Sequence, residues 1–164
     1  MNEDLMIEVM RTGVLANSHV SGVMTIKNNG VEVGRFSTLE RGVKFTNLKI
    51  GVYEMHHSKK NKGRQVKCLR PTEFYIASVL IHDAYKDDAK NLEGCIAPFL
   101  VGGEAHYSGS AEAMEQLWTL IGGFDSNHKK TIKLNILNNM PGDNRTATEW
   151  IAQRKASWDK AHKK

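Results

Sequence analysis

The feature that most constrains the fold is a change in the spacing of apolar residues near Ser108. Before this point, apolar and polar residues alternate, as at Leu5, Ile7 and Val9. Such alternation is typical of strands that bury one face. After this point, apolar residues recur at helical spacing in two segments. We therefore expect a mostly β domain of the α+β class, with a middle helix and a C-terminal helix.

The alternating half contains most of the expected strands. They cover residues 5–12, 20–27, 31–38, 48–56 and 73–82, and a further strand is expected over residues 131–137. Asn28, Asn29 and Gly30 lie between the second and third strands and predict a tight hairpin turn. The basic stretch that follows residue 56 is expected to form a hairpin tip or a loop, and the chain then returns through residues 65–69. The segment 73–82 is the most apolar and predicts the strongest strand, which ends at His82.

Two helices are predicted in the second half. One covers Ser110–Ile121, with Ser108 or Ser110 as its cap. The other covers Thr146–Lys160 and begins with a capping box formed by Thr146 and Glu149. Its Trp150, Ile151 and Trp158 are expected to pack on the β core.

The length of 164 residues fits a single domain. We expect residues 1–140 to form a β-rich core and residues 141–164 to form a helical extension. No apolar run is long enough to span a membrane, and the acidic N-terminus does not have the pattern of a secretory signal. The protein is therefore expected to be made in the cytoplasm, and to act in the periplasm or cell wall only after release or delivery.

The net charge of +5 raises the question of nucleic-acid binding. Basic residues cluster in segments 59–67 and 154–164, and no aromatic residue interleaves the first cluster. Platforms for single-stranded nucleic acid usually combine the two residue types. We therefore do not expect nucleic acid as a partner. The sequence does not predict an oligomeric state.

The segment 81–99 carries the candidate chemistry. His82 stands at its start, and Gly94 and Cys95 stand near its end. A cysteine nucleophile needs a base or cation that favours the thiolate, and donors for the oxyanion. His82 is the candidate base, and the N–H groups of Gly94 and Cys95 are the candidate donors. Two alternatives remain: a cysteine that only packs in the core, as Cys68 is expected to do, or a metal site made by His82, Cys95 and His106. Because these three residues lack the close spacing of metal ligands, we expect no metal, and we expect no cofactor.

Four motifs follow one another in a familiar order: FSTLER, LKIGVYEM, VLIHDAYKDDAKNLEGCIAPF and SGSAEAMEQLWTLI. In this order they resemble the family of domain of unknown function 5675, which is common in tailed phages and integrated elements. The resemblance covers roughly Phe36 to Ile121. The part from histidine to glycine-cysteine is also similar to L,D-transpeptidases of the YkuD type. Those enzymes are β-rich and use the cysteine as an acyl-accepting nucleophile on peptidoglycan stem peptides.

The resemblance implies a nucleophile at Cys95, preceded by Gly94, and an upstream histidine at His82. Glu93 stands where the transpeptidases have a second histidine, and Leu92 stands where they have serine. His82 must then act as the base, with Glu93 or Glu40 as the group that orients it.

The resemblance implies a cysteine peptidase or transpeptidase that acts on peptidoglycan peptides. Glu93, Ser108 and Arg41 are further candidates for binding the substrate. A non-catalytic phage protein, structural or made for interaction, is the alternative. The Leu92–Glu93 departure favours this alternative, because a carboxylate beside a thiol disfavours the thiolate.

Overall fold

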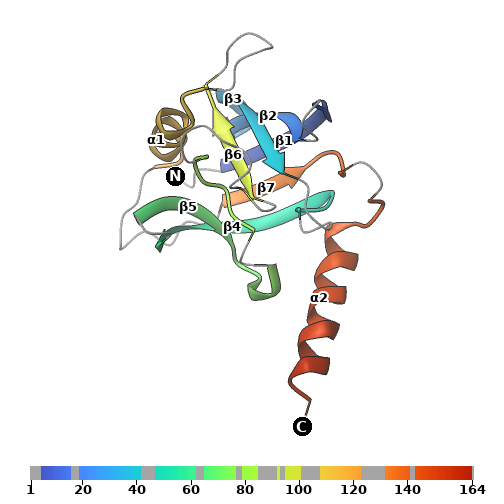
Figure 1. The fold of residues 1–164 in the computed structure, drawn as a ribbon. Coiled ribbons are helices and arrows are strands. Elements are labelled where there is room, and N and C mark those ends of the chain that lie inside the picture. Colours follow the sequence, from blue (N-terminus) through green and yellow to red (C-terminus); the bar gives the residue numbers. More distant parts are fainter. Residues whose placement is uncertain are drawn as a thin grey trace.

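The computed structural model describes residues 5–15, 19–41, 47–61, 65–76, 79–84, 92, 95–100, 108–122, 132–140 and 143–163. The elements in chain order are β1 Leu5–Val14, β2 His19–Asn28, β3 Val31–Arg41, β4 Gly51–Asn61, β5 Gln65–Pro71, the short 3-10 helix η1 Phe74–Ile76, β6 Ile96–Phe99, α1 Ser110–Leu120, β7 Ile132–Ile136 and α2 Ala147–Ala161. The expected mostly β fold with a middle and a C-terminal helix is confirmed (Figure 1).

The strands form one curled sheet in the order β5-β4-β7-β1-β2-β3-β6. β1 and β7 pair in parallel, and the other neighbours pair antiparallel. Ile81 forms an antiparallel bridge with Leu69 of β5 and a parallel bridge with Ile96 of β6. Because β5 and β6 are the two edges of the sheet, Ile81 closes the sheet on itself.

The inner face of the closed sheet holds the main core. Cross-strand partners such as Ile7 and Ile26, or Tyr53 and Leu134, lie on this face and are buried. The apolar stripe of α1 packs into the same core. The buried apolar residues are Ala113, Met114, Leu117 and Trp118 of α1, and Ile121, which caps its C-terminal end. The alternation seen in the sequence is thus the alternation between this face and the outer face.

Both expected hairpins are present. Asn29 and Gly30 connect β2 and β3 with φ angles of 51° and 84°. Two consecutive positive φ values are those of a type I′ turn, whose twist matches that of the flanking strands. β4 and β5 pair from Met55–Pro71 to Asn61–Gln65.

The expected strand over residues 73–82 is wrong for most of its length. Residues 74–76 form η1, and among the described residues of this segment only Ile81 pairs with strands. The N–H of Val79 donates to the carbonyl of Ile76 at 3.1 Å, which is a turn. The chain must reverse after Pro71 to bring Ile81 back beside Leu69. The apolar residues Ile76 and Val79 are buried by packing and not by strand pairing.

The expected serine cap of α1 is also wrong. The N-cap is Gly109, which has a left-handed φ of 68° and makes no side-chain cap. The hydroxyl of Ser110 instead donates to the carbonyl of Pro98 at 2.7 Å and accepts from the N–H of Ala84 at 2.8 Å. Ser110 therefore ties α1 to β6 and to the segment that follows Ile81.

The start of α2 agrees with the sequence, but its far half does not. Thr146 accepts the N–H of Glu149 at 3.2 Å, as the capping box predicts. Trp150 is buried in the core and Ile151 packs against it. Trp158 was expected to be buried but is 43% exposed, and its ring stacks on His162 with 4.0 Å between centroids. Figure 1 shows the reason, since the second half of α2 extends away from the sheet.

The cap of α2 leads to a first prediction. We expect Thr146→Ala to lower the free energy of unfolding by about 1 kcal/mol, because the N–H of Glu149 loses its acceptor. Thr72→Ala is the matched control, since Thr72 is exposed and its N–H bonds to the carbonyl of Glu54. Urea denaturation of both variants measures the difference. Equal stability of the two would contradict the cap.

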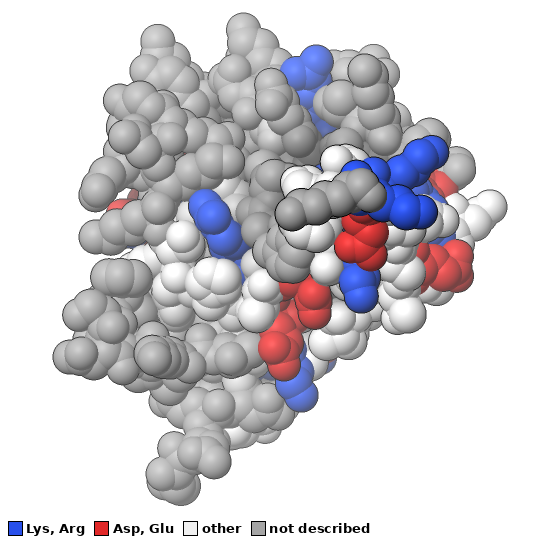
Figure 2. All heavy atoms as spheres, turned by 90° about the horizontal axis from the view of Figure 1, so that it is seen from below, with Lys and Arg blue, Asp and Glu red and all other residues white. Residues whose placement is uncertain are grey.

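Charged side chains of both signs lie close together on the face around α2. Figure 2, seen from below, shows lysine and arginine side chains next to aspartate and glutamate side chains. The expectation that nucleic acid is not the partner stays a prediction. Neither helix in the described part of the chain has the length and apolar character needed to cross a membrane.

Candidate functional site

The candidate site is built where Ile81 closes the sheet. The N–H and carbonyl groups of Ile81 and Leu69 bond to each other at 3.0 Å and 2.9 Å. On the side of β6, the backbone N–H of Ile96 donates to the carbonyl of Leu80 at 2.9 Å, and the backbone N–H of His82 donates to the carbonyl of Ile96 at 3.1 Å. These bonds hold segment 80–82 between β5 and β6. The end of the segment therefore has a fixed place beside Cys95.

Cys95 and His82 lie on the same face of neighbouring strands. Ile81 and Ile96 are register partners and belong to the inner core. Their neighbours in sequence must then point to the outer face. A second apolar cluster confirms this phase; it comprises Leu39, Cys68, Leu80, Ala84, Leu92, Cys95, Ala97 and Phe99. The register places Cys95 beside Leu80, one diagonal step from His82. From the usual strand spacing and rise, the two Cα atoms are about 8 Å apart.

The surroundings of the thiol are mostly apolar. Cys95 is 3% exposed, and its Sγ accepts the N–H of Leu80 at 3.4 Å. A peptide N–H directed at sulfur stabilises negative charge there. The N–H of Cys95 itself donates to the carbonyl of Leu92 at 2.9 Å. This corrects the expectation that this N–H points toward a substrate oxyanion. The other expected donor, Gly94, lies outside the described residues, as does Glu93.

His82 is held in a defined tautomer. Its side chain is buried, and Nδ1 is 2.6 Å from the carbonyl oxygen of Asp83. A carbonyl can only accept, so Nδ1 must carry the proton. The lone pair of the neutral imidazole is then on Nε2, which is the form that a general base requires. The group that orients the ring at Nδ1 is thus a backbone carbonyl.

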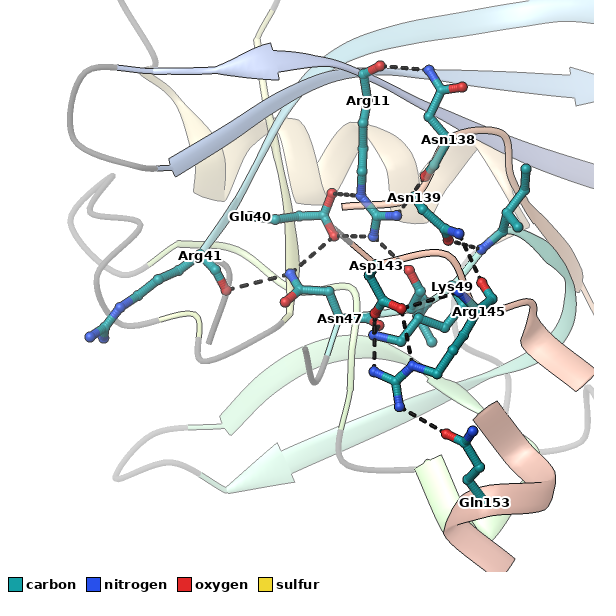
Figure 3. A network of polar contacts seen from close by, with 12 residues as sticks. Arg11, Glu40, Arg41, Asn47, Lys49, Asn138, Asn139, Asp143, Arg145 and Gln153 are labelled. Carbon is teal, nitrogen blue, oxygen red and sulfur yellow. Dashed lines mark hydrogen bonds and ion pairs between the residues drawn. The ribbon is translucent and has the colours of Figure 1, made fainter. Parts of the chain in front are cut away.

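Glu40 has a different place from the one that the sequence suggested. It pairs with Ile96 across β3 and β6, so its side chain points to the inner face, opposite to Cys95. Its carboxylate accepts two hydrogen bonds from Arg11, at 2.8 Å from Nε and 2.7 Å from Nη2. Asn47 adds a longer contact of 3.4 Å. Glu40 therefore forms an ion pair with Arg11, as Figure 3 shows.

The Arg11–Glu40 pair belongs to a larger buried network. Lys49 is fully buried; its Nζ donates to Asp143 at 2.6 Å and to the carbonyl of Asn47 at 2.7 Å. Arg145 also binds Asp143, with Nε at 3.0 Å from Oδ1. These residues come from β1, β3, the segment before β4 and the segment before α2 (Figure 3). The network therefore fastens the start of α2 to the sheet.

Burial and pairing shift the pKa values in this network. The hydrogen bond from Arg145 holds the pKa of Asp143 far below its ordinary value, and burial opposes this effect. Burial lowers the pKa of Lys49, while Asp143 acts in the opposite direction. Burial also raises the pKa of Tyr53, whose hydroxyl bonds to the backbone of Lys49. Asp143 is thus an anion that the folded state stabilises.

A second prediction concerns acid stability. Because folding lowers the pKa of Asp143, its stabilising contribution is fully present above the unfolded-state pKa of about 3.9, and is lost as the pH falls toward the folded-state pKa. We expect Asp143→Asn to remove this part of the loss of unfolding free energy at acid pH. Urea denaturation at a series of pH values measures it. The variant should also be less stable at neutral pH, since Lys49 keeps its charge without a carboxylate. An unchanged pH dependence would contradict the assignment.

The remaining sequence candidates lie elsewhere. Arg41 is exposed at the end of β3, and its carbonyl is 3.4 Å from the amide nitrogen of Asn47. Ser108 is exposed, and its carbonyl accepts the N–H of Leu100 at 3.2 Å. His106, the third member of the metal alternative, is outside the described residues. Within the described ranges, no group of three or more histidine, cysteine or acidic side chains could hold a metal ion.

The position of Cys68 was not expected from the sequence. Because Leu69 and Ile81 form a hydrogen-bonded pair, Cys68 lies opposite His82 on the outer face. It was expected only to pack, and its place in the outer cluster agrees with packing. Arg11 follows Leu5, Ile7 and Val9 at every second position of β1, so its side chain points to the buried face. This position in the sequence was a signal for the buried network.

Comparison with known proteins adds no family. No protein-family model matches the chain, and no curated protein matches it significantly.

Proposed function

We propose that the chain is a cysteine-dependent acyl-transfer enzyme with Cys95 as the nucleophile and His82 as the base. The observation that carries the proposal is the register of Ile81 with Ile96, which brings the two residues to one face of adjacent strands. The proton on Nδ1 of His82 supports it, because this leaves Nε2 as the basic nitrogen. The hydrogen bond from Leu80 to Sγ supports a thiolate.

The reaction follows from these groups. Nε2 of His82 takes the thiol proton, and the sulfur of Cys95 attacks the carbonyl carbon of a peptide bond. The protonated imidazole then gives its proton to the leaving amine, and a thioester remains on Cys95. Water as the acceptor completes a peptidase reaction, and an amine as the acceptor completes a transpeptidase reaction.

We propose peptidoglycan stem peptides as the acyl donors and a phage or mobile element as the source of the gene. Both rest only on the resemblance of four motifs to the phage-associated family and of Gly94–Cys95 to the L,D-transpeptidases, which no family model supports. Release or delivery to the cell wall would then bring enzyme and substrate together.

Digestion of purified peptidoglycan tests the proposal. The protein is incubated with peptidoglycan, and the soluble fragments are identified by mass spectrometry. New termini within stem peptides, or new cross-links when an amine donor is added, are the expected result. A fragment pattern identical to that of heat-inactivated protein would reject the enzyme.

A non-catalytic phage protein is the second candidate, and the burial of Cys95 favours it. Only 3% of the residue is exposed, and its cluster is otherwise apolar. Such a thiol would react with alkylating agents only when the protein unfolds, whereas the catalytic thiol reacts in the folded protein.

A further inference from the structure

Arg70 lies in the same row of the outer face as Cys95. Leu69 points inward, so Arg70 points outward, as does its cross-strand partner His56 on β4. The pairing of Leu69 with Ile81 puts Arg70 opposite Leu80, and the pairing of Ile81 with Ile96 puts Leu80 beside Cys95. Arg70 is therefore two strands away from the thiol at the same level of the sheet.

The guanidinium of Arg70 has an unused donor. Its Nε is buried and has no hydrogen-bond partner in the part of the chain that the structure describes. Buried N–H groups are nearly always paired, so such a donor needs an explanation. Three other arginines, Arg11, Arg35 and Arg145, each bind a carboxylate. A carboxylate from outside the chain would complete Arg70 in the same way.

We infer that Arg70 binds a carboxylate of the acyl donor whose carbonyl reacts at Cys95. This inference rests on the proposed function. Two strand spacings separate the residues by about 10 Å between Cα atoms. A peptide with a free carboxylate one to three residues from the reacting carbonyl spans this distance. The planar guanidinium can bind both carboxylate oxygens, so it fixes the direction of the donor as well as its charge.

The first test observes Arg70 itself and does not depend on the thiol. The Nε–H signal of Arg70 is assigned in ¹⁵N-labelled protein by its loss in Arg70→Gln, or by its loss in Arg70→Lys if the glutamine variant does not fold. N-acetylalanine and N-acetylalanine amide are then titrated. We expect the carboxylate to move this signal and the amide to leave it in place. Equal shifts for both compounds, or the same shift at Arg35, would overturn the inference.

The second test links Arg70 to Cys95. Iodoacetate carries a carboxylate and iodoacetamide does not, so the ratio of their rates at Cys95 reports an anion site beside the thiol. We expect Arg70→Gln to lower this ratio about tenfold, since a charge-assisted hydrogen bond is lost. Arg35→Gln, which breaks an exposed ion pair within β3, should leave the ratio unchanged.

The outcomes separate the two proposals. If Cys95 reacts with iodoacetamide but the ratio of the iodoacetate rate to the iodoacetamide rate does not depend on Arg70, the carboxylate site at Arg70 is rejected and the proposed enzyme function is kept. If Cys95 reacts with neither reagent in the folded protein, the proposed function falls, and the assignment of the carboxylate to an acyl donor falls with it.

Discussion

The Cys95→Ala variant is expected to lose all peptidoglycan cleavage and cross-linking while it remains folded. The physical reason is that no thioester can form without the sulfur. Removal of one buried sulfur from the outer cluster should cost only about 1 kcal/mol of unfolding free energy. Mass spectrometry of the digested peptidoglycan measures the activity, and urea denaturation measures the stability.

Cys68→Ala is the matched control for this prediction. Cys68 is also a buried thiol of the outer cluster, and it lies on the other side of His82. The control should keep the activity of the parent protein. Activity that survives in Cys95→Ala but disappears in Cys68→Ala would transfer the nucleophile to the second thiol and contradict the account.

The Glu40→Gln variant is expected to lose about 3–5 kcal/mol of unfolding free energy, the usual cost of leaving one member of a buried ion pair without its partner. Arg11 would keep its charge with only carbonyl acceptors, from Leu48 and Asn138. Glu32→Gln is the control, because its pair with Arg35 is exposed and should contribute less than about 1 kcal/mol. Urea denaturation measures both variants.

The same variant separates two roles for Glu40. If Glu40 serves Arg11, the alkylation rate of Cys95 in the folded Glu40→Gln protein should equal that of the parent. A stable Glu40→Gln protein with slow alkylation would instead support the orienting role that the sequence suggested for Glu40.

Local patterns predicted much of the fold correctly. The alternation around Leu5 to Val9 predicted β1, and the Asn29–Gly30 pair predicted the hairpin between β2 and β3. Both are decided by neighbouring residues, through side-chain alternation and positive φ angles. The capping box at Thr146 succeeded for the same reason.

Features that depend on distant segments were not predicted. The apolar run 73–82 has strand-like composition, yet its place opposite Leu69 requires a turn, and the turn takes residues 74–76. The parallel pairing of β1 with β7 joins segments more than one hundred residues apart. Trp158 has helical spacing with Trp150, but α2 extends past the sheet before it reaches Trp158.

The candidate site also has features that could be predicted from the sequence and features that could not. The register of Ile81 with Ile96 puts His82 and Cys95 on one face of adjacent segments. That their side chains act as a pair stays a prediction. The acceptor at Nδ1 of His82 is the backbone carbonyl of Asp83. Every residue has such a carbonyl, so this contact could not be predicted from the types of the residues. The inward direction of the Glu40 side chain could have been predicted from side-chain alternation, since Phe36, Thr38 and Glu40 lie on one face of β3.

The rate of Cys95 alkylation by iodoacetamide, followed by mass spectrometry across neutral pH, tests the central claim most directly. We expect Cys95 to react in the folded protein faster than Cys68, and His82→Ala to slow the reaction of Cys95 by about one hundredfold, the lower end of what a positioned base contributes. Equal and slow labelling of both thiols, unaffected by His82→Ala and accelerated only by denaturant, would contradict the claim that His82 activates Cys95.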